Sequence, residues 1–321
     1  MNSLKNKHVL VTGGAGFIGS HLVDRIITEA PASINVVDNF FLGKEENLDE
    51  AAVRRPDLEV YRLDASDLAS MRDLVEKQKI DVVFNLAVVP LPTSLDYPVW
   101  TVNTNIGIAL TFCELARTHN IETLIHCSSS EAYGSAESIP MNEDHPANPK
   151  TPYAASKLAG DELVLSYVRT FGIDASVVRP FNNYGPRQNP GRYAGIIPIV
   201  VKKLKTNQPI EIFGDGEQTR DYIFVKEAAE GFMKVYQNDA SRGKMLNIAT
   251  GREITINQLV SKMLDILGKP NYPVIHTEDR IGDVRRHCGG IALAKELLGF
   301  EPSVMPEEGL LETAKWYYDR L

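Results

Sequence analysis

The stretch VLVTGGAGFIGSHLV, residues 9–23, decides how the chain is expected to fold. An apolar run typical of a buried strand leads into a glycine-rich turn, and a helix-like segment follows. The glycines fit the spacing Gly14-x-Gly16-x-x-Gly19 and, in a second register, Gly13-x-x-Gly16-x-x-Gly19. Glycine at these places permits a tight turn and lets a pyrophosphate approach the helix N-terminus, where unpaired N–H groups favour negative charge. The stretch therefore predicts a strand, a turn and a helix that bind a dinucleotide.

A carboxylate at the end of the next apolar run, INVVDN (34–39), supports this interpretation. Asp38 lies 22 residues after Gly16, close to the spacing of about 20 at which a carboxylate accepts hydrogen bonds from the ribose hydroxyls. Asp38 would repel the 2′-phosphate of NADP, and no arginine follows it directly, so we expect NAD. Asp64, at the end of the third run, has two interpretations: a bond to the adenine edge, or a cap at the end of its strand.

Strand-like and helix-like segments alternate through the first half of the chain, which is the pattern of a parallel sheet. The expected strands are residues 7–13, 34–39, 58–65, 81–87, 123–129 and 174–180. The expected helices are residues 17–30, 67–77, 101–119 and 152–171. After Pro180 the alternation gives way to loops rich in glycine and proline. We therefore expect an α/β fold: a Rossmann-type doubly wound parallel sheet with a smaller, discontinuous C-terminal substrate domain.

The expected domain boundaries follow from that change of rhythm. The NAD-binding domain is expected to cover residues 1–179 and about 219–247, and the substrate domain residues 180–218 and 248–321.

Composition narrows the class of protein. The chain has 321 residues, of which 43% are hydrophobic and 24% charged, as in an ordinary globular protein with a sizeable core. Its net charge of −8 argues against a nucleic-acid partner or an anionic membrane surface. We find no apolar run long enough for a membrane span and no signal sequence, so we expect a cytoplasmic protein. The three cysteines have no CxxC spacing, which favours reduced thiols over disulfides or a metal site.

The segment TPYAASKLAG suggests acid–base chemistry. Tyr153 and Lys157 are four residues apart on a predicted helix, so both side chains lie on one face. A phenol with a pKa near 10 is a poor base at neutral pH, but a nearby ammonium and a cationic nicotinamide ring both favour phenolate. Tyr153 is then expected to take a hydroxyl proton while hydride leaves for NAD. An amphipathic helix with a surface lysine is the alternative for this pattern alone.

Seven ordered segments, spread over nearly the whole chain, carry a family resemblance. They are TGGAGFIGS, NLAVVPLPTSLDYP, CSSSEAYG, TPYAASK, RPFNNYGPRQ, TRDYIFV and LNIATG. Together they resemble the NAD-dependent sugar-nucleotide epimerase/dehydratase family, the extended short-chain dehydrogenases. The resemblance implies a nucleoside-diphosphate sugar as substrate, transient oxidation at C4 of the sugar, and homodimers formed through the helices near 101–119 and 152–171. Val88 and Ile108 depart from residues that are common in that family.

The resemblance also implies a set of site residues. Ser129 is expected to bond the C4 oxygen, with Tyr153 as base and Lys157 as its electrostatic support. The residues expected to contact NAD are Gly13, Gly16, Phe17, Ile18, Gly19, Asp38, Asn39, Asp64, Ala65, Leu86, Ala87, Tyr153, Lys157 and Pro180. The residues expected to contact the substrate are Ser130, Asn182, Arg220 and Arg280. A surface ion pair is the alternative for each arginine.

Glu131 is the residue that bears on the reaction. It matches the position at which dehydratases and decarboxylases of the family place a catalytic glutamate, whereas 4-epimerases have a neutral residue there. A 4-keto group acidifies the proton on C5, and a carboxylate can remove it so that the C6 hydroxyl leaves. The dehydratase pattern has an aspartic acid before the glutamate, and Ser130 replaces it in this chain. A solvated loop carboxylate is the bland alternative for Glu131.

These residues together predict an NAD-dependent dehydratase of a nucleoside-diphosphate hexose. A UDP-sugar such as UDP-N-acetylglucosamine is the expected substrate, with 5,6- or 4,6-dehydration, and we expect catalysis by Ser129, Glu131, Tyr153 and Lys157 without a metal. A decarboxylase is disfavoured because the loop NEDHPANPKTPY lacks an arginine for a substrate carboxylate. A UDP-hexose 4-epimerase is the alternative enzyme, and a dinucleotide-sensing protein is the alternative from another class.

Overall fold

The computed structural model describes residues 2–118, 121–191, 195–279 and 283–320. Its centre is a seven-stranded parallel sheet in the order β11-β6-β5-β4-β1-β2-β3. The strands are β1 (His8–Thr12), β2 (Ser33–Asp38), β3 (Glu59–Arg62), β4 (Val82–Asn85), β5 (Thr123–Cys127), β6 (Ala175–Pro180) and β11 (Met245–Ile248). The strand order reverses between β1 and β4, and such a switch point opens a crevice at the carboxyl ends of the strands.

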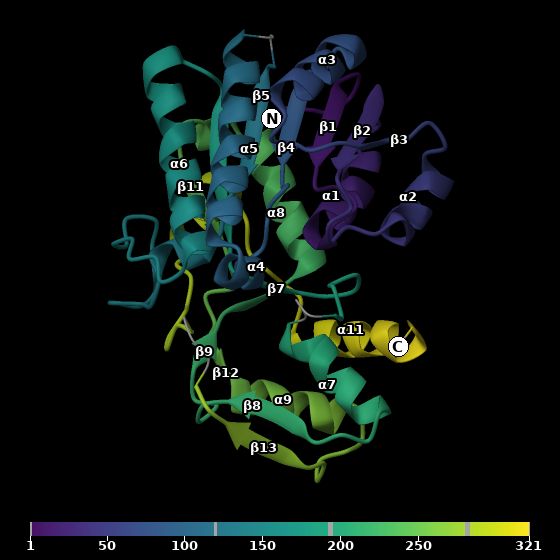
Figure 1. Ribbon diagram of the computed structural model, residues 1–321, viewed down its shortest axis with the longest axis vertical. Coiled ribbons are helices and arrows are strands. Elements are labelled where there is room, and N and C mark those ends of the chain that lie inside the picture. The colour runs from purple at the N-terminus through teal and green to yellow at the C-terminus, as the bar shows by residue number, and fades with distance from the viewer. Residues whose placement is uncertain (1, 119–120, 192–194, 280–282, 321) are drawn as a thin grey trace.

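Helices cover both faces of this sheet (Figure 1). Alternate side chains of β1 point to opposite faces, so Val9 and Val11 join one apolar core and Leu10 joins the other. The helices of the first core are α1 (Phe17–Ile27), α2 (Asp49–Arg54), α8 (Val225–Gln237) and α10 (Ala292–Leu298). The helices of the second core are α3 (Leu68–Gln78), α5 (Pro98–Thr118) and α6 (Pro152–Phe171). This arrangement confirms the expected Rossmann-type doubly wound fold.

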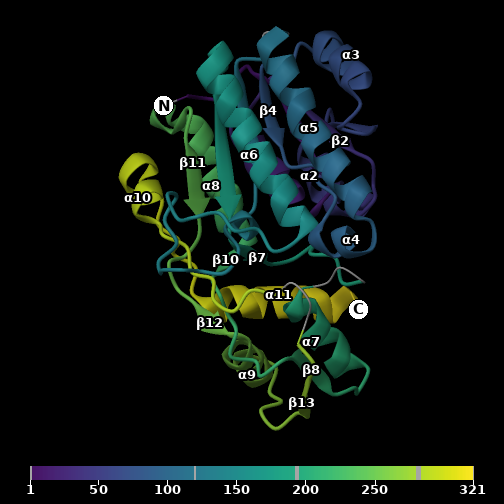
Figure 2. The same ribbon diagram turned by 60° about the vertical axis from the view of Figure 1, so that its left-hand side comes forward.

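A smaller part lies beyond the carboxyl ends of the strands, in the lower half of Figures 1 and 2. Its own apolar core includes Val200, Ile212, Leu259 and Tyr317. Its helices are α7 (Ile196–Lys205), α9 (Ile256–Ile266) and α11 (Pro306–Arg320). Its strand pairs are β8 (Ile210–Phe213) with β13 (Val274–Thr277), and β9 (Thr219–Arg220) with β12 (Ile254–Thr255).

Short elements connect the two parts. The pair β7 (Asn182–Tyr184) and β10 (Tyr222–Phe224) lies directly below the main sheet in Figure 2. The remaining elements are α4 (Leu91–Asp96) and three 3-10 helices, η1 (Glu45–Leu48), η2 (Ser130–Tyr133) and η3 (Asp239–Ser241).

One segment crosses the domain boundary that the sequence suggested. Residues 248–321 were expected in the substrate domain, but α10 packs against the main sheet, where Leu298 and Phe300 complete the first core. The return of the chain to the main sheet at α10 was hard to predict because this helix is short and has no distinctive motif. The division into two domains stays a prediction.

In the part of the chain that the structure describes, no helix is both long and apolar enough to cross a membrane.

Candidate active site

The glycine-rich turn forms a tight cradle between β1 and α1. Gly13 has a φ of +66°, which side chains other than glycine rarely adopt. A Cβ atom on Gly19 would lie 2.1 Å from the carbonyl oxygen of Gly13, and one on Gly13 would lie 2.9 Å from the backbone of Leu86. At Gly16, the N-cap of α1, no side chain satisfies the first N–H groups of the helix. This is the geometry that a pyrophosphate requires, so the cradle fits a dinucleotide.

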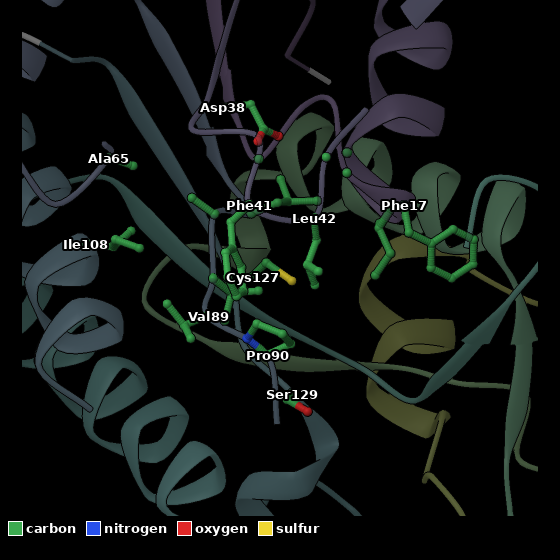
Figure 3. A pocket seen from close by; sticks show the side chains of 18 of the residues that line it. Phe17, Asp38, Phe41, Leu42, Ala65, Val89, Pro90, Ile108, Cys127 and Ser129 are labelled. Atoms are coloured by element: carbon green, nitrogen blue, oxygen red, sulfur yellow. The ribbon is translucent and has the colours of Figure 1, made fainter. Parts of the chain in front are cut away.

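A cavity of about 380 Å³ extends from this cradle along the carboxyl ends of the strands. Figure 3 shows it between Asp38, at the end of β2, and Ser129, just beyond β5. We call it the first cavity. All the residues predicted to contact NAD line it, together with Ser129, Ser130, Glu131 and Asn182. The structure therefore brings these residues to one place, and the role of each stays a prediction.

Asp38 is held rigidly at one end of the first cavity. Its carboxylate accepts hydrogen bonds from the backbone N–H groups of Ala15, at 3.1 Å, and Phe40, at 2.8 Å. Burial raises its pKa, while these two N–H groups and the charge of Arg62 lower it. Arg62 is the neighbour of Asp38 on β3, which sequence spacing did not reveal. The Arg62 guanidinium stacks on Phe40 and bonds Glu45 at 3.2 Å, so it is already engaged.

The contacts of Asp64 agree with the interpretation of this residue as a cap at the end of its strand. One carboxylate oxygen accepts from both the backbone N–H, at 2.9 Å, and the hydroxyl, at 2.7 Å, of Ser66. The side chain nevertheless lines the first cavity. Its other oxygen has no such bond to Ser66, so an additional contact with adenine is compatible with the turn.

We expect Asp38→Asn to weaken NAD binding roughly tenfold or more, because an amide keeps the shape but accepts less strongly from ribose hydroxyls than a carboxylate does. NADP binding is expected to change less, since the repulsion of its 2′-phosphate disappears. Calorimetric titration with both cofactors measures the two effects. Asp64→Asn is the matched control and is expected to have the smaller effect. Tighter binding of NADP than of NAD by the unaltered protein would contradict our assignment of Asp38.

Tyr153 and Lys157 lie one turn apart on α6 and face the first cavity. Pro152 starts the helix, and the Thr151 hydroxyl caps it by accepting from the N–H of Ala154 at 3.2 Å. The Lys157 ammonium donates to the carbonyl oxygen of Cys127 at 2.6 Å. The lysine is thus anchored to the end of β5, the strand that leads into Ser129.

The phenol of Tyr153 is held in its neutral form. Burial raises its pKa, and the charges of Glu131 and Asp161 act in the same direction, whereas a hydrogen bond with the Ser129 hydroxyl lowers it. Burial also lowers the pKa of Lys157. The Lys157 ammonium is already bonded to the carbonyl oxygen of Cys127. A further positive charge in the cavity would stabilise the phenolate, so we expect Tyr153 to lose its proton most easily when such a charge enters.

Ser129, Ser130 and Glu131 lie at the start of the 3-10 turn η2, beside Tyr153. The Ser129 hydroxyl accepts from the N–H of Glu131 at 3.2 Å, which fixes the position of the glutamate relative to the serine. On the other side, His287 bonds the carbonyl oxygen of Ser130 at 3.2 Å. His287 is buried and its pKa is lowered to about 4 by burial, so its ring is neutral. The sequence did not single out His287, because no local pattern marks its contact with a turn 157 positions away.

The predicted substrate residues are divided between two cavities. Asn182 lines the first cavity and also a second cavity of about 550 Å³, which Arg220 lines with Lys202 and Lys203. Arg220 is almost fully buried, donates to the Val284 carbonyl oxygen at 2.7 Å, and pairs with Asp283. Arg280 lies outside the described residues.

The wall of the first cavity opposite α1 is apolar. Val89, Pro90 and Ile108 belong to it, and Phe41 and Leu42 project into the same space from the loop after β2 (Figure 3). The sequence had flagged only Val88 and Ile108, as departures from family residues. In the ranges that the structure describes, no group of three or more His, Cys, Asp or Glu side chains is placed to hold a metal ion.

Comparison with known proteins gives a consistent result. The model of the NAD dependent epimerase/dehydratase family matches residues 9–249. The UDP-glucose 4-epimerase of Mycolicibacterium smegmatis is 34% identical over 313 residues, covering 97% of this chain and 98% of the relative. The dTDP-glucose 4,6-dehydratase of an Actinoplanes species is 33% identical over 320 residues, covering 96% and 97%. Relatives with two different reactions are therefore about equally similar.

A solved structure with a cofactor agrees with this. The dTDP-glucose 4,6-dehydratase DesIV of Streptomyces venezuelae, with NAD bound, superposes with a TM-score of 0.91 at 30% identity and covers 98% of this chain and 97% of its own.

Proposed function

The chain belongs to the NAD-dependent epimerase/dehydratase family, uses NAD as its cofactor, and, we propose, is a dehydratase of a nucleoside-diphosphate hexose. The observation that carries the proposal is the position of Glu131. Its side chain lines the cavity that also contains Tyr153 and Ser129, and its charge raises the pKa of Tyr153. An epimerase that only oxidises and reduces C4 has no need of this carboxylate.

The substrate is proposed to span both cavities. Asn182 lines each of them, so a hexose in the first cavity can continue into a diphosphate and nucleoside in the second. Arg220 offers the planar guanidinium that suits phosphate oxygens, and Lys202 and Lys203 add positive charge. We expect a diphosphate to compete with Asp283 for Arg220. A UDP-linked hexose such as UDP-N-acetylglucosamine is our first choice, in line with the UDP-glucose named for the mycobacterial relative.

The first step is removal of the C4 hydroxyl proton by Tyr153, with Ser129 bonding the same oxygen. Bound NAD supplies the acceptor for the C4 hydride and can return it. Lys157 holds the end of β5 through the Cys127 carbonyl and therefore keeps Ser129 in register with Tyr153. The result at C4 is a ketone.

The second step depends on Glu131. The ketone makes the C5 proton acidic, Glu131 removes it, and the C6 hydroxyl leaves, so that a double bond forms between C5 and C6 and one water is lost. Ser130 is a weaker acid than the aspartic acid of the dehydratase pattern, so the departing hydroxyl takes its proton less readily. Our first choice for the product is the 5,6-alkene, in which the C4 hydroxyl is restored, and the second is a 4-keto-6-deoxy sugar.

Mass spectrometry of the products from a panel of nucleotide sugars tests this function. We expect a product that has lost one water. A 5,6-alkene carries no hydrogen at C5, whereas a 4-keto-6-deoxy sugar formed in deuterated water carries deuterium there. A substrate deuterated at C4 separates the two outcomes, because the label ends at C4 in the 5,6-alkene and at C6 in the 4-keto-6-deoxy sugar. A product of unchanged mass, inverted at C4 and without exchange at C5, would support the 4-epimerase instead.

The 4-epimerase remains the second candidate because Ser130 departs from the dehydratase pattern and an epimerase is among the similar relatives. A dinucleotide-sensing protein is disfavoured, because Ser129, Tyr153 and Lys157 are all present in one cavity.

We also propose a homodimer through α5 and α6. These two long helices pack against each other along one side of the sheet (Figure 2), and the exposed apolar residues Leu110 and Phe171 lie on them.

A further inference from the structure

A buried ion pair lies directly behind the proposed catalytic lysine. Asp161 is one helical turn beyond Lys157 on α6, and its carboxylate accepts from the Arg179 guanidinium at 2.9 Å from Nε and 2.7 Å from Nη2. The side chains of Asp161 and Arg179 are 1% and 3% exposed. Taking two charges out of water is costly, so a buried ion pair is weak evidence for a role in stability alone.

A hydrogen bond connects the Asp161–Arg179 pair to the chain just beyond β5, next to Ser129. The hydroxyl of Ser128 donates to the same Asp161 oxygen at 2.7 Å. Ser128 lies between Cys127, whose carbonyl accepts from Lys157, and Ser129. The carboxylate of Asp161 therefore holds both the helix that carries Tyr153 and the strand end that carries Ser129.

Arg179 is fixed on its other side. Its guanidinium lies over the ring of Tyr133, 4.3 Å from the ring centroid, and the Tyr133 hydroxyl donates to Asn247 at 2.9 Å. The second Asp161 oxygen is buried without a hydrogen bond, so the carboxylate is stabilised on one side only. The negative charge of Asp161 raises the pKa of Lys157 and so opposes the effect of burial on that ammonium.

We propose that Asp161 and Arg179 are positioning residues whose balanced charges set the pH range in which Tyr153 and Lys157 can work. This inference rests on the proposed function. Asp161 stabilises the ammonium of Lys157 at a buried position, and Arg179 offsets the negative charge that would otherwise oppose loss of the Tyr153 proton. A pair of opposite charges can support the charged Lys157 and the deprotonated Tyr153 together. A single buried charge would stabilise one of these two states and destabilise the other.

The other charged and titratable groups around Lys157 and Tyr153 come from four elements. They are His126 and Cys127 of β5, Glu131 and Tyr133 of η2, Arg179 of β6 and Asp161 of α6. Burial keeps His126 neutral and raises the pKa of the Cys127 thiol to about 11. Burial raises the pKa of Asp161, while the charges of Arg179 and Lys157 and the hydrogen bond from Ser128 lower it.

Removal of one member of the pair has a predictable direction. Asp161→Asn leaves the guanidinium unbalanced, because arginine does not lose its proton in proteins. The pH profile for C4 oxidation is expected to have an acidic limb, set by loss of the Tyr153 proton, and an alkaline limb, set by loss of the Lys157 proton. Extra positive charge makes both groups give up their protons more readily, so both limbs are expected to move about one pH unit lower. The double variant Asp161→Asn/Arg179→Gln is expected to return both limbs close to their original places, and Asp161→Glu to leave them there.

A second measurement does not depend on turnover. Carbon-13 NMR of labelled tyrosine follows the Tyr153 phenol directly, with Tyr153→Phe identifying its signal, and Asp161→Asn is expected to lower the pH at which it titrates. Asp161→Asn leaves the Arg179 charge buried without its partner and is expected to lower stability. The carboxyl signal of Asp161 in the unaltered holoenzyme therefore gives an independent test. We expect it to stay ionised through the active pH range, and protonation of Asp161 within that range would overturn the proposal.

Matched variants separate this role from a structural one. Ser128→Ala removes a hydrogen bond to Asp161 but no charge. Both limbs of the pH profile are therefore expected to keep their positions, even if kcat changes. Unshifted limbs in Asp161→Asn, with kcat lowered evenly at every pH, would overturn the inference. Retained turnover in Tyr153→Phe would instead overturn the proposed function, so the two failures are distinguishable.

Discussion

Tyr153→Phe is expected to lower the rate of C4 oxidation by about a thousandfold or more, while binding of the nucleotide sugar stays nearly unchanged. General-base catalysis by a positioned side chain contributes about 10² to 10⁴ to a rate, and this variant removes the only oxygen that performs it. Binding persists because the proposed diphosphate contacts lie in the second cavity, around Arg220. Single-turnover formation of NADH and calorimetric titration measure the two quantities separately.

The burial of Tyr153 adds a pH dependence to this prediction. Its pKa is raised, so in the unaltered protein C4 oxidation should become faster as the pH rises and more of the phenol loses its proton. Tyr167→Phe is the matched control, since Tyr167 is on the same helix but bonds Glu114 away from the first cavity. Normal turnover is expected there. If Tyr153→Phe retained turnover, Tyr153 would have to be removed from the mechanism.

Glu131→Gln is expected to lower water loss by about a thousandfold while C4 oxidation continues, because the amide cannot remove the C5 proton. The oxidised sugar should accumulate together with NADH absorbance, without exchange of deuterium at C5. Exchange is measured by NMR in deuterated water, and water loss by mass spectrometry. The amide matches the carboxylate in size, so the turn η2 should keep its shape.

Glu137→Gln is the matched control for Glu131, because Glu137 lies shortly after η2 and is exposed. We expect normal dehydration from it. Normal dehydration from Glu131→Gln as well would leave Glu131 as a loop carboxylate without a chemical role, and the assignment to dehydratases would lose its main support.

Local rules explain why much of the fold was predictable. The glycine turn, Asp38 at the end of β2, and the Tyr153–Lys157 pair all depend on geometry within one strand, one turn or one helix. The helix expected at residues 152–171 has the same bounds in α6, because Pro152 begins it and Gly172 ends it in the left-handed conformation. The parallel pairing of the strands followed from the alternation of elements, because parallel strands need helical crossovers.

The sequence by itself determined the class of fold, the cofactor and the residues that gather at the carboxyl ends of the strands, because these depend on short-range spacing. Tertiary structure decided which partner each polar group takes. It gives Lys157 the carbonyl of Cys127, Arg220 the carboxylate of Asp283, and Asp161 the guanidinium of Arg179. Each choice is a competition between groups from different elements in a water-free interior, where an unpaired charge is costly, so its outcome depends on packing that spacing along the chain does not reveal.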